Sequence, residues 1–247
     1  MLQNDLFVSK VRDACRISNL KSVPKYLGFL DSAQLNTAVS VIKNEKANYC
    51  IFGGHSECER NFICVLPDWM EAENTVFPIK AIKFTFNDEY KLSHRDFLGA
   101  LMSLGIKREV VGDIFVYDGV AFAFVAENIA DYLVTEISKV GSVGVKVQIC
   151  DNPDISATVK YDDRTQTVSS LRLDCVVSAV CGVGRKAAVG LIESGFVSVN
   201  NFAIAKTVYA VKQGDKISVR KYGKFLIDDC SGATKKQRVI LNYKKYV

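Results

Sequence analysis

The middle of the chain alternates between strand-like and helix-like patterns, and this alternation restricts the fold more than any other feature. Residues 79–86, "IKAIKFTF", alternate in polarity as a strand does, and residues 93–105 have helical spacing. Residues 113–127 predict a hairpin that turns at Asp118-Gly119. A helix over 128–140, capped by Asn128, and a strand over 143–150 follow. The predicted order is therefore β-α-β-β-α-β.

That order is the split-βαβ, ferredoxin-like arrangement. RNA-recognition (RRM) domains share it with many metal and metabolite binders, so the fold alone does not decide the function. The segment "VAFAFVAE" lacks the basic-Gly-aromatic start of the RNA-stacking signature. Phe122 and Phe124 lie on one face of their strand. We interpret them as core residues, with base stacking as the alternative.

The whole chain is predicted to be an α+β protein of three small domains. Residues 1–75 form a mixed α/β domain, with helices near 6–15 and over 32–46, the latter capped by Ser32, and with strands over 48–54 and 61–67. Residues 76–160 form the RRM-like ferredoxin-fold domain. A polar stretch, 151–166, connects it to the third domain, residues 165–247, which ends in a basic tail.

The third domain begins with two short helices, over 168–184 and 185–195, and continues with strands. Gly195 stands at the left-handed position that ends a helix. The strands cover 196–206, 215–228 and 236–245, and Asn200-Asn201 and Gly214-Asp215 supply turn residues between them.

Positive charge is concentrated in the third domain. Residues 165–247 carry 14 Lys/Arg and 5 Asp/Glu, whereas residues 1–164 carry 18 and 22. A basic module on a near-neutral body indicates nucleic-acid binding. A solvated basic surface is the alternative.

Composition argues against several classes of protein. No run approaches the roughly 18 apolar residues of a membrane span. The N-terminus lacks a basic-then-apolar leader, so we expect a cytoplasmic protein with reduced cysteines. Cys50, His55, Cys58 and Cys64 lack the paired CxxC spacing of structural zinc sites. We expect a monomer with no metal, no cofactor, no membrane partner and no small-molecule substrate.

A series of landmarks in the third domain carries a specific resemblance. In chain order they are Arg172-Leu173-Asp174, Arg185-Lys186, Leu191-Ile192, Gly195, Val197-x-Val199-Asn200 and Gly214-Asp215-x-Ile217. They resemble the alpha-L RNA-binding motif, first seen in small-subunit ribosomal protein four. Gly184 stands where that motif usually has a serine. The chain therefore lacks one hydroxyl that could contact phosphate.

The chain as a whole resembles the YlmH family of bacterial RNA-binding proteins. The match is strongest at "SHRDFLGALMSLGIKREVVGDI" (93–114) and in the third domain through "KKQRVIL" (235–241). The resemblance implies a non-catalytic protein with rRNA, tRNA and the large ribosomal subunit as partners. It also implies a role in ribosome-associated quality control, on subunits that carry a stalled peptidyl-tRNA. Genes of the family are often associated with cell division.

Basic residues around the two short helices and the strands are predicted to bind RNA. Proteins read A-form RNA through its phosphates and 2′-hydroxyls, and the N–H groups at a helix start favour an anion. Solvation alone is the alternative for the lysines of the tail. The predicted residues in this domain are Arg172, Arg185, Lys186, Asn200, Lys206, Arg220, Lys221, Lys224, Lys235, Lys236 and Arg238.

The triplet at 94–96, His-Arg-Asp, looks catalytic at first. Ser93 and Asp96, however, have the spacing of a capping box, which gives Asp96 a structural task at the start of a helix that ends at Gly105. A second basic pair follows that helix. We predict an RNA or ribosome contact here, with a purely structural helix start as the alternative. Its residues are His94, Arg95, Lys107 and Arg108.

Enzyme and adaptor classes remain as alternatives. The catalytic motif of pseudouridine synthases contains Arg-Leu-Asp, but Arg172-Leu173-Asp174 is followed here by "CVVSAV" and lies where the binding motif needs its first helix. The methyltransferase class needs a glycine-rich loop after a strand, whereas "CGVGRK" (181–186) fits a turn between helices. We therefore predict no catalysis. A cell-division adaptor with a protein partner on the acidic middle domain is the other alternative.

Overall fold

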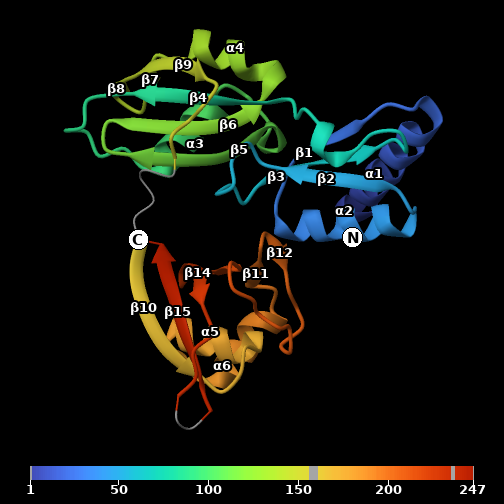
Figure 1. The fold of residues 1–247 in the computed structure, drawn as a ribbon. Helices are drawn as coiled ribbons and strands as arrows, with labels where there is room; N and C mark the ends of the chain where they lie inside the picture. The colour runs from blue at the N-terminus through green and yellow to red at the C-terminus, as the bar shows by residue number, and fades with distance from the viewer. Residues whose placement is uncertain (1, 156–160, 235–236, 247) are drawn as a thin grey trace. The chain divides into compact units, whose positions relative to one another are not determined.

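The computed structural model describes residues 2–155, 161–234 and 237–246. The chain divides into two compact units, residues 1–158 and 159–247, each with its own helices and antiparallel sheets (Figure 1). The mixture of helices and sheets confirms the α+β character that the sequence predicts.

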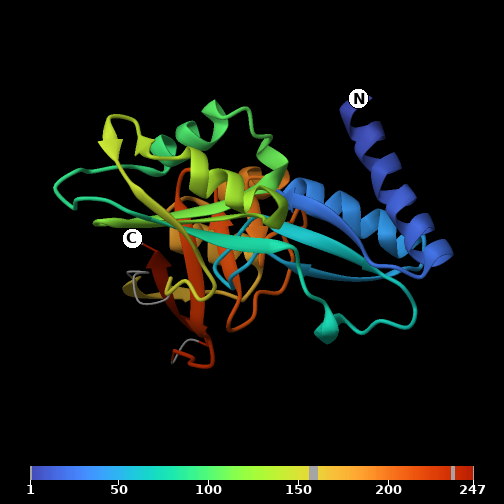
Figure 2. The same cartoon turned by 90° about the horizontal axis from the view of Figure 1, so that it is seen from above.

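The first unit begins with a three-stranded sheet of order β1-β3-β2, built from β1 (Lys25–Leu30), β2 (Asn48–Phe52) and β3 (Asn61–Leu66). Helices α1 (Leu2–Lys21) and α2 (Ser32–Asn44) pack against it (Figure 2). The central strand β3 is buried throughout. Strand β1 is not predicted by the sequence. The cap of α2 is Asp31 and not Ser32, because the Asp31 carboxylate accepts the Gln34 N–H at 2.9 Å.

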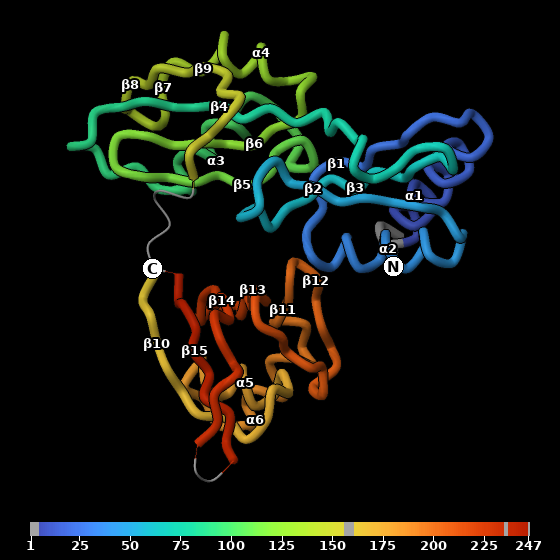
Figure 3. The backbone as a smooth tube through the Cα atoms, viewed as in Figure 1, coloured from blue at the N-terminus to red at the C-terminus, as the bar shows by residue number. Residues whose placement is uncertain are grey.

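The second part of the first unit has the predicted order of elements. Its sheet, β5-β6-β4-β9, comprises β4 (Ile79–Thr85), β5 (Val111–Tyr117), β6 (Val120–Ala126) and β9 (Lys146–Cys150). Helices α3 (His94–Ser103) and α4 (Glu127–Glu136) bury Phe97, Leu101 and Leu133 against this sheet. The β5–β6 hairpin turns at Asp118-Gly119 as predicted (Figure 3).

One helix of this part differs from its prediction. Helix α4 begins at Glu127 after the N-cap residue Ala126, so Asn128 lies inside the first turn and is not the cap. The helix ends at Glu136, and a short strand pair, β7 (Lys139–Val140) and β8 (Val143–Gly144), follows. Hydrophobic spacing continues past the helix because Ile137 and Val140 are buried in the same core.

The loop between β2 and β3 of the first sheet contacts strands β5 and β6 of the second sheet. One carboxylate oxygen of Asp113 on β5 accepts the backbone N–H groups of Glu59 and Arg60, both at 2.7 Å. The ring of Phe124 packs so closely on Gly54 that an added Cβ there would lie 2.3 Å from it. Residues 1–75 and 76–158 thus lie in one compact unit. Their division into two separate domains remains a prediction.

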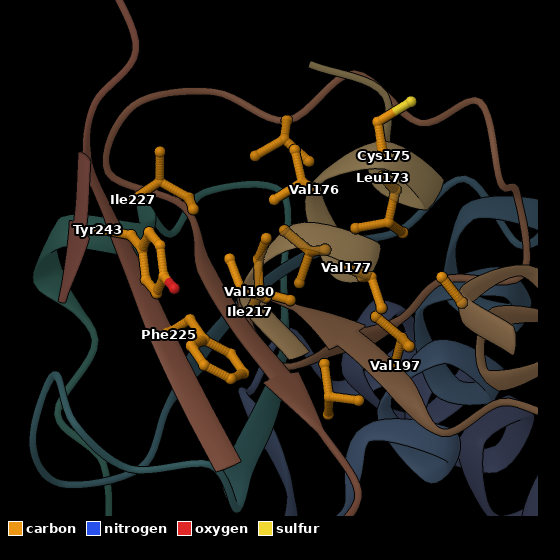
Figure 4. Packing of buried hydrophobic residues seen from close by; sticks show 14 of the residues in the cluster. Leu173, Cys175, Val176, Val177, Val180, Val197, Ile217, Phe225, Ile227 and Tyr243 are labelled. Atoms are coloured by element: carbon orange, nitrogen blue, oxygen red, sulfur yellow. The ribbon is translucent and has the colours of Figure 1, made fainter. Parts of the chain in front are cut away.

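The second unit is a six-stranded sheet of order β10-β15-β14-β13-β11-β12 with two helices. Helix α5 places residues such as Val177 and Val180 against Ile217 and Phe225 of the sheet (Figure 4). The elements are β10 (Tyr161–Val168), α5 (Leu173–Cys181), α6 (Arg185–Glu193), β11 (Val197–Val199), β12 (Phe202–Ala203), β13 (Lys216–Val219), β14 (Gly223–Asp229) and β15 (Val239–Tyr246).

Part of the predicted connection between domains is a strand. Residues 161–166 belong to β10, which pairs with β15 from Tyr161↔Tyr246 to Val168↔Val239. The segment is polar because β10 is an edge strand whose residues before Val168 are largely solvent-exposed. Its partner strand, β15, follows roughly 80 residues later in the chain, so a local sequence pattern cannot predict the pairing.

Candidate nucleic-acid interface

A buried carboxylate joins the two arginines at the starts of α5 and α6. Asp174 is only 3% exposed, whereas Arg172 and Arg185 are 43% and 56% exposed. Arg172 donates to both carboxylate oxygens at 3.1 Å, and Arg185 donates through Nε and Nη2 to Oδ2 at 3.0 and 2.8 Å. The two predicted RNA-binding arginines are therefore brought together, and each keeps much of its side chain in solvent.

The electrostatics of this triad are coupled. Burial alone would raise the pKa of Asp174, but the hydrogen bonds and charges of Arg172 and Arg185 outweigh it and lower the pKa. In return, the hydrogen bonds that Arg185 donates to Asp174 raise the pKa of Arg185. The carboxylate remains ionised, and two cations against one anion leave a net positive surface. The sequence names Asp174 as a motif landmark, but its task as the anchor of both arginines becomes visible only in the structure.

The start of α6 is open to solvent. Gly184 is the N-cap residue with extended backbone angles, and no side chain caps the helix. Lys186 follows in the first turn and is exposed. The helix ends as predicted, with Gly195 in the left-handed region at φ +72°. This arrangement leaves the N–H groups of the first turn available to an anion.

Asn200 holds a turn together with its side chain. Its amide nitrogen donates to Asp215 at 2.8 Å, and its amide oxygen accepts the Lys216 N–H at 2.9 Å. Asn200 and Asn201 both have positive φ, as the tight turn between β11 and β12 requires. The residue has a clear structural task, and its predicted contact with RNA remains a prediction.

The remaining basic residues of the second unit lie in several places. Lys206, Arg220, Lys221 and Arg238 are exposed. The Arg220 Cζ lies 5.2 Å from the ring centroid of Phe196, and the Lys224 Nζ lies 6.0 Å from the ring centroid of Tyr246. Arg238 donates to the carbonyl of Thr167 at 2.9 Å. Lys235 and Lys236 lie outside the described residues.

The predicted contact in the first unit combines structural and exposed groups. Asp96 accepts the N–H and the hydroxyl of Ser93, both at 2.7 Å, which confirms the capping box. His94, Arg95 and Lys107 are exposed. Desolvation and the nearby charge of Arg108 lower the pKa of His94. The His-Arg-Asp triplet is therefore a capped helix start, with a half-buried arginine close to it.

The part of the β5-β6-β4-β9 sheet that carries Phe122 and Phe124 is covered, unlike the RNA-stacking face of an RRM domain. Phe122 and Phe124 are 6% and 2% exposed, which confirms that they are core residues. Phe124 lies under Gly54, and the Tyr117 hydroxyl donates to the carbonyl of buried Ile155 at 3.4 Å. Base stacking on these rings is excluded by their burial.

The cysteine cluster is part of the first sheet. Cys50 and Cys64 face each other across the β2–β3 pair, and desolvation raises the pKa of Cys64 to about 12. Within the described ranges no group of three His, Cys, Asp or Glu residues could hold a metal.

No single helix in the described part of the chain is long and apolar enough to cross a membrane. Helices α5 and α6 together have the length and apolar composition of a membrane span, but the pair is bent by 112°. Helix α5 is largely buried in the core of the second unit.

Comparison with known proteins gives consistent matches. Residues 73–154 match the family model "Putative RNA-binding domain in YlmH". The chain is 27% identical over 241 residues to the Ribosome-associated protein quality control protein P2 of Bacillus subtilis (strain 168), a match that covers 97% of this chain and 94% of that protein. The structure is similar to the Cell division protein ylmH from Streptococcus pneumoniae, with a TM-score of 0.54 and 18% identity over 65% of this chain and 96% of that chain. This last likeness concerns the fold.

Proposed function

The chain resembles the YlmH family over nearly its whole length, and on that premise we propose that it is a non-catalytic protein that binds structured RNA on the ribosome. The single observation that carries the proposal is the pair of arginines that Asp174 holds at the starts of α5 and α6. Because the anchor is buried and the arginines are half-exposed, their guanidinium groups are oriented before RNA arrives.

The net charge of the second unit supports the same proposal. The second unit, residues 159–247, carries 16 Lys/Arg and 7 Asp/Glu. Several of these basic residues lie near aromatic rings or on turns that project into solvent. An excess of nine positive charges on one unit attracts a polyanion and makes its binding depend steeply on salt.

The finer proposal is binding to the large ribosomal subunit with a stalled peptidyl-tRNA, in ribosome-associated quality control in the cytoplasm. It is supported by the name of the Bacillus subtilis relative, a ribosome-associated quality control protein. The RNA ligands would be rRNA and tRNA, both of which present A-form helices to a basic surface.

The burial and the hydrogen bonds of Asp174 argue against catalysis of the pseudouridine synthase type. A carboxylate that attacks a base must reach the substrate, whereas Asp174 is buried and its oxygens accept hydrogen bonds from two arginines and the Cys175 N–H. A cell-division adaptor is the second candidate, favoured by the name of the similar Streptococcus pneumoniae structure.

Co-sedimentation with purified ribosomal subunits tests the proposal. The full chain is expected to migrate with large subunits at low salt and to dissociate at moderate salt. Arg185→Gln is expected to weaken this association, whereas Lys43→Gln, which removes an exposed charge on α2, leaves it unchanged. An adaptor would stay at the top of the gradient under all conditions, and that result would reject RNA binding on the ribosome.

A further inference from the structure

The first unit contains a cavity of about 390 Å³ whose lining is rich in positive charge. Four basic side chains line it, Lys10, Arg60, Lys107 and Arg108, and we call it the arginine pocket. Only two acidic residues, Asp31 and Glu109, stand among the lining residues of the described chain. Lys107 and Arg108 belong to the predicted contact, whereas Lys10 and Arg60 carry no motif and were not predicted from the sequence.

Both arginines of the pocket are anchored by backbone carbonyls. Arg60 donates through Nη2 to the carbonyl of Phe29 at 2.6 Å. Arg108 donates through Nη1 to the carbonyls of Val111 and Gly112, the latter at 3.1 Å. A carbonyl orients a guanidinium without cancelling its charge. The carbonyls therefore leave both arginine charges in a partly desolvated place, where only the nearby carboxylates offset them.

The two acidic lining residues have other tasks. The Asp31 carboxylate caps α2 by accepting the Gln34 N–H, and its charge also opposes the lowering of the Arg60 pKa by desolvation. Glu109 is about half exposed and lies 3.9 Å from Lys10. Asp113 lies close enough to act electrostatically on both arginines, and one of its oxygens accepts the backbone N–H groups of Glu59 and Arg60. These carboxylates offset only part of the positive charge of the pocket.

Arg60 has a buried donor without an acceptor. Its Nε is buried and has no hydrogen-bond partner among the described residues. An unsatisfied buried donor destabilises the fold, and natural proteins retain such groups chiefly where an ion, a water or a function accounts for them. Desolvation lowers the pKa of Arg108, and the nearby charge of Arg60 lowers it further. A bound oxyanion would accept a hydrogen bond from the unsatisfied Nε of Arg60 and would reduce the repulsion between the two arginines.

We propose that the arginine pocket binds a phosphate group of RNA, as a second contact that lies outside the basic second unit. Phosphate suits the pocket because arginine forks bind its oxygens with paired hydrogen bonds, while Lys10 and Lys107 add charge at the rim. The volume admits one phosphate with part of its sugar. This inference rests on the proposed RNA binding.

The test measures the affinity of the full chain for ribosomal RNA by filter binding over a series of salt concentrations. Lys107→Gln and Arg60→Gln are each expected to weaken binding about 5- to 10-fold and to reduce the salt slope by about one. Lys107 is exposed, so its substitution leaves the fold intact even if Arg60→Gln destabilises the unit. Lys43→Gln is the matched control and keeps the wild-type affinity and slope.

A second measurement separates RNA phosphate from free phosphate. Thermal unfolding of the wild type and of Lys107→Gln is followed with inorganic phosphate and with chloride at equal ionic strength. If phosphate stabilises only the wild type but RNA affinity is equal in both proteins, the pocket serves a free phosphate and the RNA assignment is wrong. If neither readout differs, the pocket is not an anion site.

The two proposals fail in distinguishable ways. If the wild type does not bind ribosomal RNA, the proposed function fails and this inference fails with it. If the wild type binds RNA and Arg185→Gln weakens that binding, while Lys107→Gln and Arg60→Gln leave it unchanged, only the inference about the arginine pocket is overturned.

Discussion

The two units hold their arginine pairs in opposite ways. In the second unit, Arg172 and Arg185 share the carboxylate of Asp174, so the triad carries one net positive charge and its geometry is fixed by ion pairs. In the first unit, Arg60 and Arg108 are anchored by backbone carbonyls, and the carboxylate of Asp113 lies near both of them. The first arrangement orients its arginines through ion pairs, whereas the second orients them through neutral carbonyls and leaves the buried Nε of Arg60 without an acceptor among the described residues.

The largest expected effect is on the stability of the second unit. Replacing both Arg172 and Arg185 by glutamine leaves Asp174 buried without a cationic partner. We expect the free energy of unfolding to fall by about 2–3 kcal/mol, less than for a fully buried pair because both arginines are half-exposed. Urea unfolding measures the loss. Adding Asp174→Ala to the double variant should recover part of it, and a further loss of stability would contradict the comparison.

The corresponding pair in the first unit should behave differently. Arg60→Gln together with Arg108→Gln removes donors to carbonyls but also removes the repulsion between two cations. We expect a loss of about 1–2 kcal/mol, smaller than in the second unit. Urea unfolding under the same conditions gives this value. An equal or larger loss would mean that the carbonyl-held pair stabilises the fold as strongly as the carboxylate-held pair.

Asp174→Asn tests whether the anchor acts through the arginines. The substitution keeps the size of the side chain but removes its charge, so we expect a loss of about 1–2 kcal/mol in stability. We also expect RNA affinity to fall about 3- to 10-fold, although a residue that is 3% exposed cannot itself reach RNA. Filter binding measures the affinity, and an unchanged value would show that the arginines need no anchor.

The pH dependence of stability gives a further test of the triad. The pKa of Asp174 in the folded protein is lowered, so its ion pairs stabilise the fold above the ordinary aspartate range near pH 4 and are lost as the pH falls through the folded value. The difference in stability between the wild type and Asp174→Asn should therefore be constant near neutral pH and shrink below about pH 4. Urea unfolding from pH 3 to 7 measures it, and a difference that grows on acidification would contradict the triad.

The smallest expected effect concerns Gly184. An added Cβ at this position meets no atom within 4 Å, and the backbone angles are those of an ordinary N-cap. Gly184→Ser should add a capping hydroxyl and raise stability by a few tenths of a kcal/mol. A small gain in RNA affinity should accompany it, measured by filter binding. A loss of affinity would contradict this expectation and would indicate that the RNA site of this chain requires glycine at position 184.

Local patterns account for the elements that the sequence predicted well. The alternation in 79–86, the turn at Asp118-Gly119 and the capping box of Ser93 and Asp96 are all readable over a few residues. The sequence motif contains Arg172, Asp174 and Arg185 in this order, but it does not predict that both arginines donate to the Asp174 carboxylate.

Long-range partners explain what the sequence did not predict. Strand β10 is polar at its edge and is formed by its distant partner β15. The arginine pocket joins residues of α1, the β2–β3 loop and the segment after α3, and Arg60 has no local pattern that marks it. Its only sequence sign is a basic residue directly before a buried strand.

The most direct test of the central claim is the salt dependence of RNA binding by the wild type and by Arg185→Gln. The account predicts that the logarithm of the wild-type affinity falls steeply and linearly with the logarithm of salt concentration. In Arg185→Gln it predicts a weaker affinity at every salt concentration and a slope reduced by about one. An affinity that does not respond to salt, or a variant that matches the wild type in affinity and slope, would contradict the account.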